Sequence, residues 1–215
     1  MNPQKSTLYK YAGLLNSCTR ARLVGTRGTD EIFNLQVSDC EASLEFLPES
    51  GKVIDVGSGG GLPGIVWAVC RPDLEITLLD SINKKCEAVR EIVEALEIKN
   101  VSVICSRSEE FANLNREKFD LAGARALASA GVTAELLSPL VKVGGKILTF
   151  KGEKVHDEIS GAENQWHKLG LKKPSLNFYG DENSSKCLLI WEKISPCPKK
   201  FPRRTGLAGT KNFWE

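Results

Sequence analysis

The sequence lacks several features that would point to particular protein classes. No apolar run approaches the roughly 18 residues that a membrane-spanning helix needs, and the opening stretch MNPQKSTLYK has no apolar core of the signal-peptide type. Histidine occurs twice, methionine occurs once, and no two of the seven cysteines form a Cys-x-x-Cys pair. We therefore expect a cytoplasmic protein without a metal site, whose cysteines are reduced and mostly buried.

The remaining composition is that of an ordinary globular protein. The 215 residues are 41% hydrophobic and 26% charged, which is enough for one α/β domain with small appendages. The net charge of +2 is unevenly distributed, because five basic residues and one acidic residue follow Ile194. We predict a helical segment over 1–50, a main domain over 51–194 and a basic tail over 195–215 that is irregular rather than packed.

Strand-like and helix-like segments alternate through the main domain. Apolar residues at helical spacing over 6–47 predict two or three preceding helices. Buried strands are predicted at 52–56, 75–80, 101–106, 119–125 and 144–150, with helices between them and a terminal antiparallel pair at 175–179 and 186–194. This alternation predicts an α/β fold with a doubly wound, mostly parallel, seven-stranded sheet.

The glycine-rich stretch VIDVGSGGGLPGI marks a candidate ligand site. Gly57, Gly59 and Gly61 directly follow a strand, at the crevice where ligands bind in such sheets. The spacing does not fit the dinucleotide fingerprint, and the carboxylate of Asp55 would repel a pyrophosphate. A nicotinamide oxidoreductase is therefore disfavoured. S-adenosylmethionine, which has an ammonium group and no phosphate, suits this acid better.

Further candidates lie at the ends of the later strands. Asp80 ends the second strand, where a carboxylate can accept hydrogen bonds from both ribose hydroxyls. Ser108 and Glu109 follow the third strand and could bond an adenine, although the helix dipole alone also favours an acid there. Arg125 ends the fourth strand, where the alternative is a salt bridge in the crevice wall. No Asn/Asp-Pro-Pro-aromatic loop and no catalytic cysteine follows that strand.

Six motifs together resemble one known family. DVGSGGGLPGI, LLDSINKKCEAVREI, SRSEEF, FDLAGARALAS, GGKILTFKG and PKKFPRRTG resemble, in order and spacing, the RsmG family, also called glucose-inhibited division protein B, over about residues 50–206. The resemblance implies a Rossmann-like class I methyltransferase that uses S-adenosylmethionine to methylate N7 of one guanine in bacterial 16S ribosomal RNA. It places cofactor contacts at Gly57, Leu62, Asp80, Ser108, Glu109 and Arg125.

The segment before residue 50 departs from that family. Arg22–Val24 stands where the family usually has Asn-Leu-Thr, and Leu35–Gln36 stands where it has Arg-His. Asp39 alone matches the family's Asp-Ser, and Gly60 replaces a frequent proline. The cofactor half of the predicted site is therefore intact, whereas the N-terminal part facing the substrate is altered.

The chemistry implied by the resemblance requires little from the protein beyond positioning. Guanine N7 carries an in-plane lone pair and no proton, so it can attack the methyl carbon without a general base. We assign Arg125 as the predicted catalytic residue, acting on the cofactor or on an RNA phosphate rather than on the guanine. The predicted cofactor-binding set is Asp55, Gly57, Ser58, Gly59, Gly61, Leu62, Asp80, Ser81, Ser108, Glu109 and Arg125.

Ribosomal RNA is the expected partner. Lys199, Lys200, Arg203 and Arg204 form a basic strip that can contact phosphates of 16S ribosomal RNA or of the small ribosomal subunit, and Arg20, Arg22 and Arg27 are a second candidate patch. We expect a monomer without a membrane or metal partner. Two alternatives stay open: a methyltransferase acting on another RNA or a small molecule, and an RNA-binding relative without catalysis.

Overall fold

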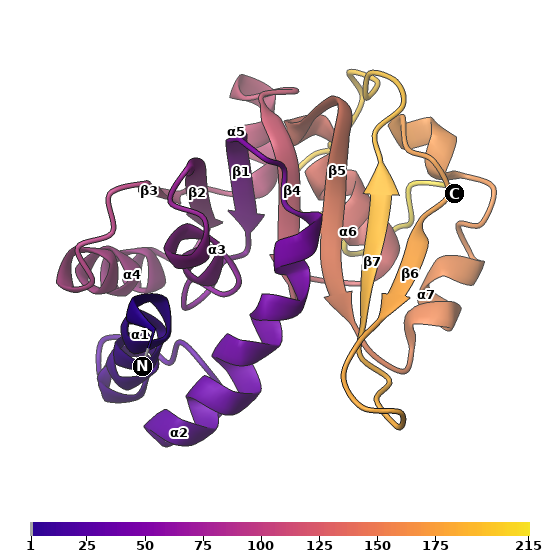
Figure 1. Ribbon diagram of the computed structural model, residues 1–215. Helices are drawn as coiled ribbons and strands as arrows, with labels where there is room; N and C mark the ends of the chain where they lie inside the picture. The colour runs from indigo at the N-terminus through magenta and orange to yellow at the C-terminus, as the bar shows by residue number, and fades with distance from the viewer. Residues whose placement is uncertain (1) are drawn as a thin grey trace. The chain divides into compact units, whose positions relative to one another are not determined.

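The computed structural model describes residues 2–215, which divide into two compact units, one ending at Ser106 and one spanning Arg107–Glu215 (Figure 1). Seven strands make a mostly parallel sheet with helices, which confirms the predicted fold class. The first unit contributes strands in the order β3-β2-β1, and the second contributes β4-β5-β7-β6. The predicted division of the chain into segments 1–50, 51–194 and 195–215 stays a prediction, because a compact unit need not be a functional one.

The first unit begins with helices, as the apolar spacing predicted. Helix α1 (Pro3–Ser17) starts at Asn2, whose side chain accepts a hydrogen bond from the Gln4 N–H at 3.0 Å. Its buried face includes Leu8, Tyr11 and Leu15. A continuous run of helical turns follows, made of α2 (Thr29–Ile32), the π-helical turn η1 (Phe33–Val37) and the 3₁₀ helix η2 (Ser38–Phe46).

Three parallel strands form the sheet of the first unit. They are β1 (Gly51–Val56), β2 (Leu74–Asp80) and β3 (Val101–Cys105). Helix α3 (Gly64–Cys70) packs on β2, and α4 (Asn83–Ala95) packs on β2 and β3. Val56 pairs with Leu79 and Asp80 pairs with Cys105. The carboxyl ends of the three strands therefore lie at one edge, which brings the glycine stretch next to Asp80.

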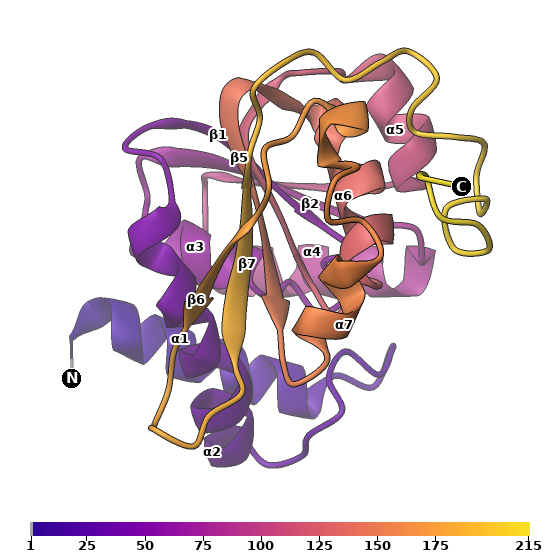
Figure 2. The same ribbon diagram turned by 90° about the vertical axis from the view of Figure 1, so that its right-hand side faces the viewer.

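The second unit carries a mixed sheet. Its elements are α5 (Ser108–Leu114), β4 (Phe119–Arg125), α6 (Ala130–Leu137), η3 (Ser138–Leu140), β5 (Val141–Lys151), α7 (Val155–Ser160), η4 (Trp166–Leu169), β6 (Ser175–Phe178) and β7 (Cys187–Glu192). Strand β4 is parallel to β5, whereas β7 is antiparallel to both β5 and β6, which confirms the predicted terminal pair. Helix α6 packs on β4, β5 and α7 (Figure 2).

The basic tail is irregular, as expected, but it is packed. Cys197, Phe201 and Phe213 are buried, and Figure 2 shows the segment running past α5 and α6. The prediction that residues 195–215 do not pack is therefore wrong. Its cause is that charge and proline content describe the chain locally, whereas the apolar side chains of the tail find partners far away in sequence.

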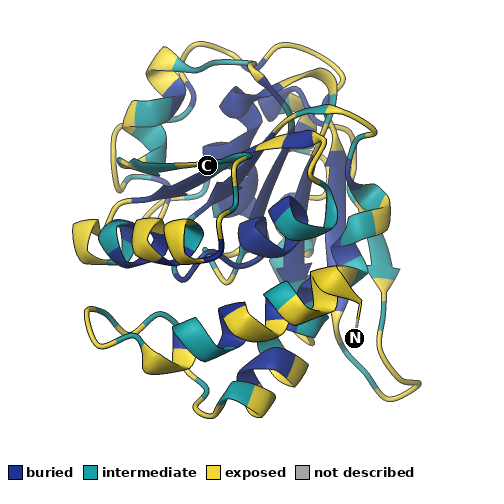
Figure 3. Ribbon diagram, turned by 60° about the vertical axis from the view of Figure 1, so that its left-hand side comes forward, coloured by how far each residue is buried: buried dark blue, intermediate teal, exposed yellow. Residues whose placement is uncertain are grey.

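Burial follows the layers of each unit. Figure 3 shows mostly buried strands and helices whose outer faces are exposed. The seven cysteines are free; Cys40, Cys86, Cys187 and Cys197 are buried, whereas Cys105 is exposed. No helix within residues 2–215 combines the length and hydrophobicity that crossing a membrane requires.

Candidate functional site

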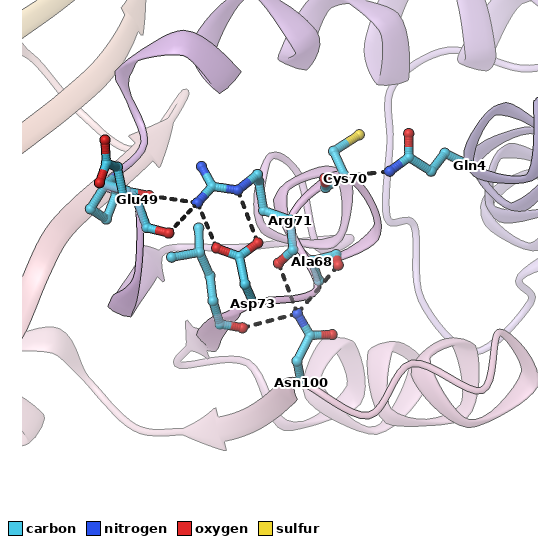
Figure 4. Close-up of polar contacts among 9 residues, drawn as sticks. Gln4, Glu49, Ala68, Cys70, Arg71, Asp73 and Asn100 are labelled. Atoms are coloured by element: carbon cyan, nitrogen blue, oxygen red, sulfur yellow. Dashed lines mark hydrogen bonds and ion pairs between the residues drawn. The ribbon is translucent and has the colours of Figure 1, made fainter.

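A polar clamp fixes the end of the first unit's sheet that lies opposite the glycine stretch (Figure 4). An Arg71 Nη2 donates to the backbone oxygens of Pro48 and Glu49 at 2.8 and 2.7 Å. The Asn100 amide donates to three backbone oxygens between Ala68 and Leu74, at 3.0–3.3 Å. These bonds fix where α3 ends and β2 begins. The loops at the carboxyl ends of the strands therefore start from a rigid framework.

The glycine stretch turns sharply over the end of β2. The N–H groups of Gly57 and Ser58 both donate to the Leu79 oxygen, at 2.7 and 3.0 Å. Gly59 has φ +56°, and a Cβ there would meet nothing closer than the Gly57 oxygen at 3.9 Å. Gly61 has φ +96°, and a Cβ there would lie 2.6 Å from Ile65 Cδ1. Gly61 is therefore required by packing, whereas the space beside Gly59 is open for a ligand.

Asp80 connects the two loops at this edge. Its Oδ2 accepts the Gly59 N–H and its Oδ1 accepts the Ile82 N–H, each at 2.9 Å. The residue is 9% exposed. Because each carboxylate oxygen can accept more than one hydrogen bond, Asp80 can hold both loops and still accept hydrogen bonds from two ligand hydroxyls. The exposed Ser81, also in the predicted set, follows in the same turn.

Asp55 has a structural partner within the loop. It is fully buried, and its Oδ2 accepts the Gly64 N–H at 2.9 Å, at the start of α3. A Cβ on Gly64 would lie 2.1 Å from Leu78 Cδ2, so the helix starts in direct contact with the strands. Asp55 thus holds the first turn of α3 in place. Its predicted contact with a ligand ammonium group stays a prediction.

Two residues of this edge were missed by the sequence analysis. The buried Tyr11 of α1 donates its hydroxyl proton to the Gly60 oxygen at 2.8 Å. Ile82 is 48% exposed immediately beside Asp80. Tyr11 falls within the apolar spacing over 6–47 that predicted helices, but this spacing carries no information about the partner of its hydroxyl group. The position of Ile82 in the turn after the strand could have been interpreted as a signal for an apolar contact with a ligand.

The other predicted cofactor residues lie in the second unit. Ser108 and Glu109 begin α5, where the Ser108 hydroxyl donates to Glu109 Oε2 at 3.2 Å. Glu109 Oε1 also accepts the Gly206 N–H at 2.9 Å, so this carboxylate holds the tail. Arg125 ends β4, half-buried, with its guanidinium carbon 6.0 Å from the centre of the Phe150 ring. The roles predicted for these three residues stay predictions.

The four basic tail residues differ in their surroundings. Lys199, Lys200 and Arg204 are exposed, as phosphate contacts require. Arg203 instead bonds both carboxylate oxygens of Glu135, at 2.9 and 2.7 Å, and this glutamate is only 1% exposed. The hydrogen bond that Arg203 donates to the Glu135 carboxylate raises the pKa of Arg203. Arg203 thus anchors the tail, and its predicted contact with RNA stays untested.

Comparison with solved structures identifies the class of fold. No group of three or more His, Cys, Asp or Glu side chains within residues 2–215 is arranged to hold a metal ion. A solved rRNA methylase from Streptococcus thermophilus has a TM-score of 0.53 at 16% identity, covering 74% of this chain and 95% of its own. A putative methyltransferase from Streptococcus mutans, solved with SAH, has a TM-score of 0.54 at 17% identity, covering 72% and 97%. The fold is that of the Rossmann-like methyltransferases.

Sequence comparison identifies the particular family. The family model GidB, described as rRNA small subunit methyltransferase G, matches residues 4–187. Ribosomal RNA small subunit methyltransferase G of Petrotoga mobilis is 38% identical over 170 residues, 78% of this chain and 75% of that protein. Its namesake in Clostridium perfringens strain SM101 is 36% identical over 210 residues, 94% and 87%. The chain belongs to this family, which confirms the resemblance found in its motifs.

Proposed function

We propose that this protein transfers the methyl group of S-adenosylmethionine to N7 of a guanine in the 16S ribosomal RNA of the small subunit. One observation carries the proposal: in a chain of the rRNA small subunit methyltransferase G family, Asp80 holds the loops of Gly59 and Ile82 together beside open backbone. The predicted action as a monomer in the cytoplasm belongs to the same proposal.

The residues of the first unit suit each part of the cofactor. Asp80 would accept hydrogen bonds from the ribose hydroxyls, and the exposed side chain of Ile82 would contact the adenine. The methionine part would lie along the open backbone at Gly59, where its charged groups meet peptide N–H and C=O groups. Contacts from Asp55, Ser81, Ser108, Glu109 and Arg125 are part of the proposal. Gly57, Ser58, Gly61 and Leu62 shape the loop.

The chain's task in the reaction is alignment. When bound, the cofactor supplies a methyl group on a sulfonium, which N7 of guanine takes with its own lone pair as the carbon–sulfur bond breaks. No proton is lost from N7, so no general base is needed, and near-attack alignment can contribute about 7–11 kcal/mol. The product base is cationic, so an arginine against the guanine would oppose its formation. Arg125 is therefore assigned to the cofactor or to a phosphate.

The exposed tail residues suit an RNA backbone. Lys199, Lys200 and Arg204 would contact phosphates, which gives affinity and a dependence on salt rather than a choice of sequence. Arg203 positions these residues by holding the tail on Glu135. The target base must be exposed before its N7 edge can reach the cofactor.

The test is a transfer assay that identifies the base. The protein is incubated with methyl-tritiated S-adenosylmethionine and either 16S ribosomal RNA or small subunits that lack their methylations, and the RNA is then digested to nucleosides. Label in 7-methylguanosine is expected, and its loss in Asp80→Asn would connect it to the proposed site. Label in another base would contradict the N7 assignment. Cofactor binding without transfer to either substrate would favour the non-catalytic relative or another substrate.

A further inference from the structure

The segment that joins α1 to α2 lines a cavity of about 510 Å³ that is open to solvent on one side. This volume falls within the roughly 300–1,000 Å³ of small-molecule and cofactor sites. Its walls come from the last turn of α1 and from the loop up to Arg27, so it lies entirely within the first unit. The cavity coincides with the part of the sequence that departs from the family pattern, at Arg22–Val24.

The cavity is cationic. Arg22 and Arg27 line it and are exposed, and the described residues that line it include no carboxylate. Arg20, two residues earlier, is held on α4 by Glu87 and Glu91, at 3.3 and 2.6 Å. Of the three arginines predicted as a second basic patch, two therefore line the cavity, and the third forms ion pairs outside it.

Hydrogen bonds hold the loop in its shape. The Asn16 side chain accepts the Gly28 N–H at 2.9 Å, which closes the loop at its base. The Gln36 amide donates to the Thr26 hydroxyl at 3.1 Å, and Thr26 lines the cavity. Arg22 donates to the Gly25 oxygen at 3.1 Å. The loop is thus organised before any ligand binds, which lowers the entropic cost of binding.

The cavity lies against the glycine stretch. Leu15 and Leu23 line it, and a Cβ built on Gly60 would lie 3.0 Å from Leu15 Cδ2 and 3.1 Å from Leu23 Cβ. The same two side chains therefore form the wall of the cavity and the support of the loop that carries Gly59. A ligand in the cavity would be held at a fixed position relative to the proposed cofactor.

We propose that this cavity binds the sugar–phosphate backbone of the RNA next to the target guanine, with the phosphate on Arg22 and Arg27. This inference rests on the proposed function and adds a substrate subsite to it. Guanidinium groups bind phosphate oxygens through paired hydrogen bonds, and the absence of a carboxylate among the described lining residues favours an anion. The tail supplies phosphate contacts at the surface, whereas this cavity fixes one phosphate beside the loop.

The test compares three arginines of one segment. Arg22→Gln and Arg27→Gln each remove a cavity charge, and Arg20→Gln removes an equal charge outside it. Affinity for an unmodified 16S ribosomal RNA transcript is measured from 50 to 200 mM salt, and affinity for S-adenosylmethionine is measured separately. Each cavity variant is expected to bind the RNA several-fold more weakly at the lower salt concentration, with the slope of log affinity against log salt reduced by about 0.7–0.9. Arg20→Gln should keep the wild-type slope.

Each other outcome contradicts the inference in a distinguishable way. If all three variants keep the wild-type slope and the wild-type protein methylates the RNA, the subsite is contradicted and the proposed function stands. A parallel loss of cofactor affinity would show that the arginines support the loop rather than bind RNA. A wild-type protein that neither binds nor methylates the transcript or the small subunit would overturn the proposed function and the subsite together.

Discussion

At the scale of single residues, two glycines of the glycine stretch meet different requirements, which are packing at Gly61 and open space for a ligand at Gly59. Gly61 has φ +96° and no room for a Cβ, so Gly61→Ala must displace Ile65 and the loop above it. We expect the affinity for S-adenosylmethionine to fall more than tenfold and the free energy of unfolding to fall by about 1–3 kcal/mol. Calorimetric binding and urea unfolding would measure the two effects.

Gly144 offers a matched control for this substitution. It has φ +88° in β5, and nothing lies within 4 Å of a Cβ built there. Gly144→Ala should therefore cost stability through the same backbone strain while leaving cofactor affinity unchanged. Equal cofactor affinity in the two variants would mean that the conformation of the loop does not control binding.

The cysteine beside Asp80 gives a prediction that depends on pH. Cys86 is buried, and its thiol donates to the backbone oxygen of Asp80 at 3.4 Å. Burial first, and then a hydrogen bond with Cys105, raise the pKa of Cys86 to about 12. Because this value lies above the unfolded value of about 8.5, the stability linked to Cys86 is fully present below pH 8.5 and is lost as the pH rises towards 12.

Alkylation followed by mass spectrometry tests this assignment. Iodoacetamide at pH 8 is expected to modify the exposed Cys105 well before Cys86, because the reagent needs an accessible thiolate. The modification of Cys86 should still be slow at pH 10. A Cys86 that reacts as fast as Cys105 at pH 8 would contradict its burial as a neutral thiol.

At the scale of elements, helix α1 supports the glycine stretch of the proposed cofactor site. The Tyr11 hydroxyl holds the Gly60 oxygen, so Tyr11→Phe leaves a buried carbonyl without this donor. Losing a hydrogen bond of about 1 kcal/mol predicts a weakening of S-adenosylmethionine binding by about fivefold. Tyr9→Phe is the control, because Tyr9 lies on the same helix and its hydroxyl bonds the exposed Asp30. Unchanged cofactor affinity in Tyr11→Phe would separate α1 from the site.

Elements were predictable from the sequence to the extent that they are local. The strand from Phe119 to Arg125 and the helix after Asn83 follow from apolar spacing, and the position of Asp80 follows from its place at a strand end. The bond from Tyr11 to Gly60 spans 49 residues, and neither partner shows in its own segment that the other will be near. Periodicity identifies which face of a helix or strand is buried. The residues that pack against that face are set only when the whole chain folds.

At the scale of the whole molecule, the tail is tied down by polar bonds that composition could not reveal. Arg116 donates to the backbone oxygens of Cys197 and Phe201 at 2.7 and 2.6 Å. Arg203 and Glu135, 68 residues apart, form an ion pair at 2.7 Å in which the glutamate side chain is 1% exposed. A run of basic residues alone is typical of a solvated extension, so the sequence predicted the charge of the tail but not its packing.

This ion pair gives a stability prediction. Arg203→Gln removes the cationic partner of the buried Glu135 carboxylate and should lower the free energy of unfolding by about 3 kcal/mol. The double variant Glu135→Gln/Arg203→Gln should lose less, because no buried charge remains. Arg204→Gln should leave stability unchanged and weaken RNA binding, since Arg204 is exposed. Urea unfolding of the wild-type protein and these three variants measures the differences, and equal losses in Arg203→Gln and the double variant would contradict the prediction.

The central claim is that the loops after β1 and β2, joined by Asp80, bind S-adenosylmethionine. Equilibrium binding of this cofactor to the wild-type protein and to Asp80→Asn tests it most directly, with NAD as the competing ligand. The wild-type protein should bind one S-adenosylmethionine and not NAD. Asp80→Asn should bind it at least tenfold more weakly, because the amide nitrogen cannot accept a hydrogen bond from a backbone N–H or a ribose hydroxyl. Equal affinity in both proteins, or a preference for NAD, would contradict the account.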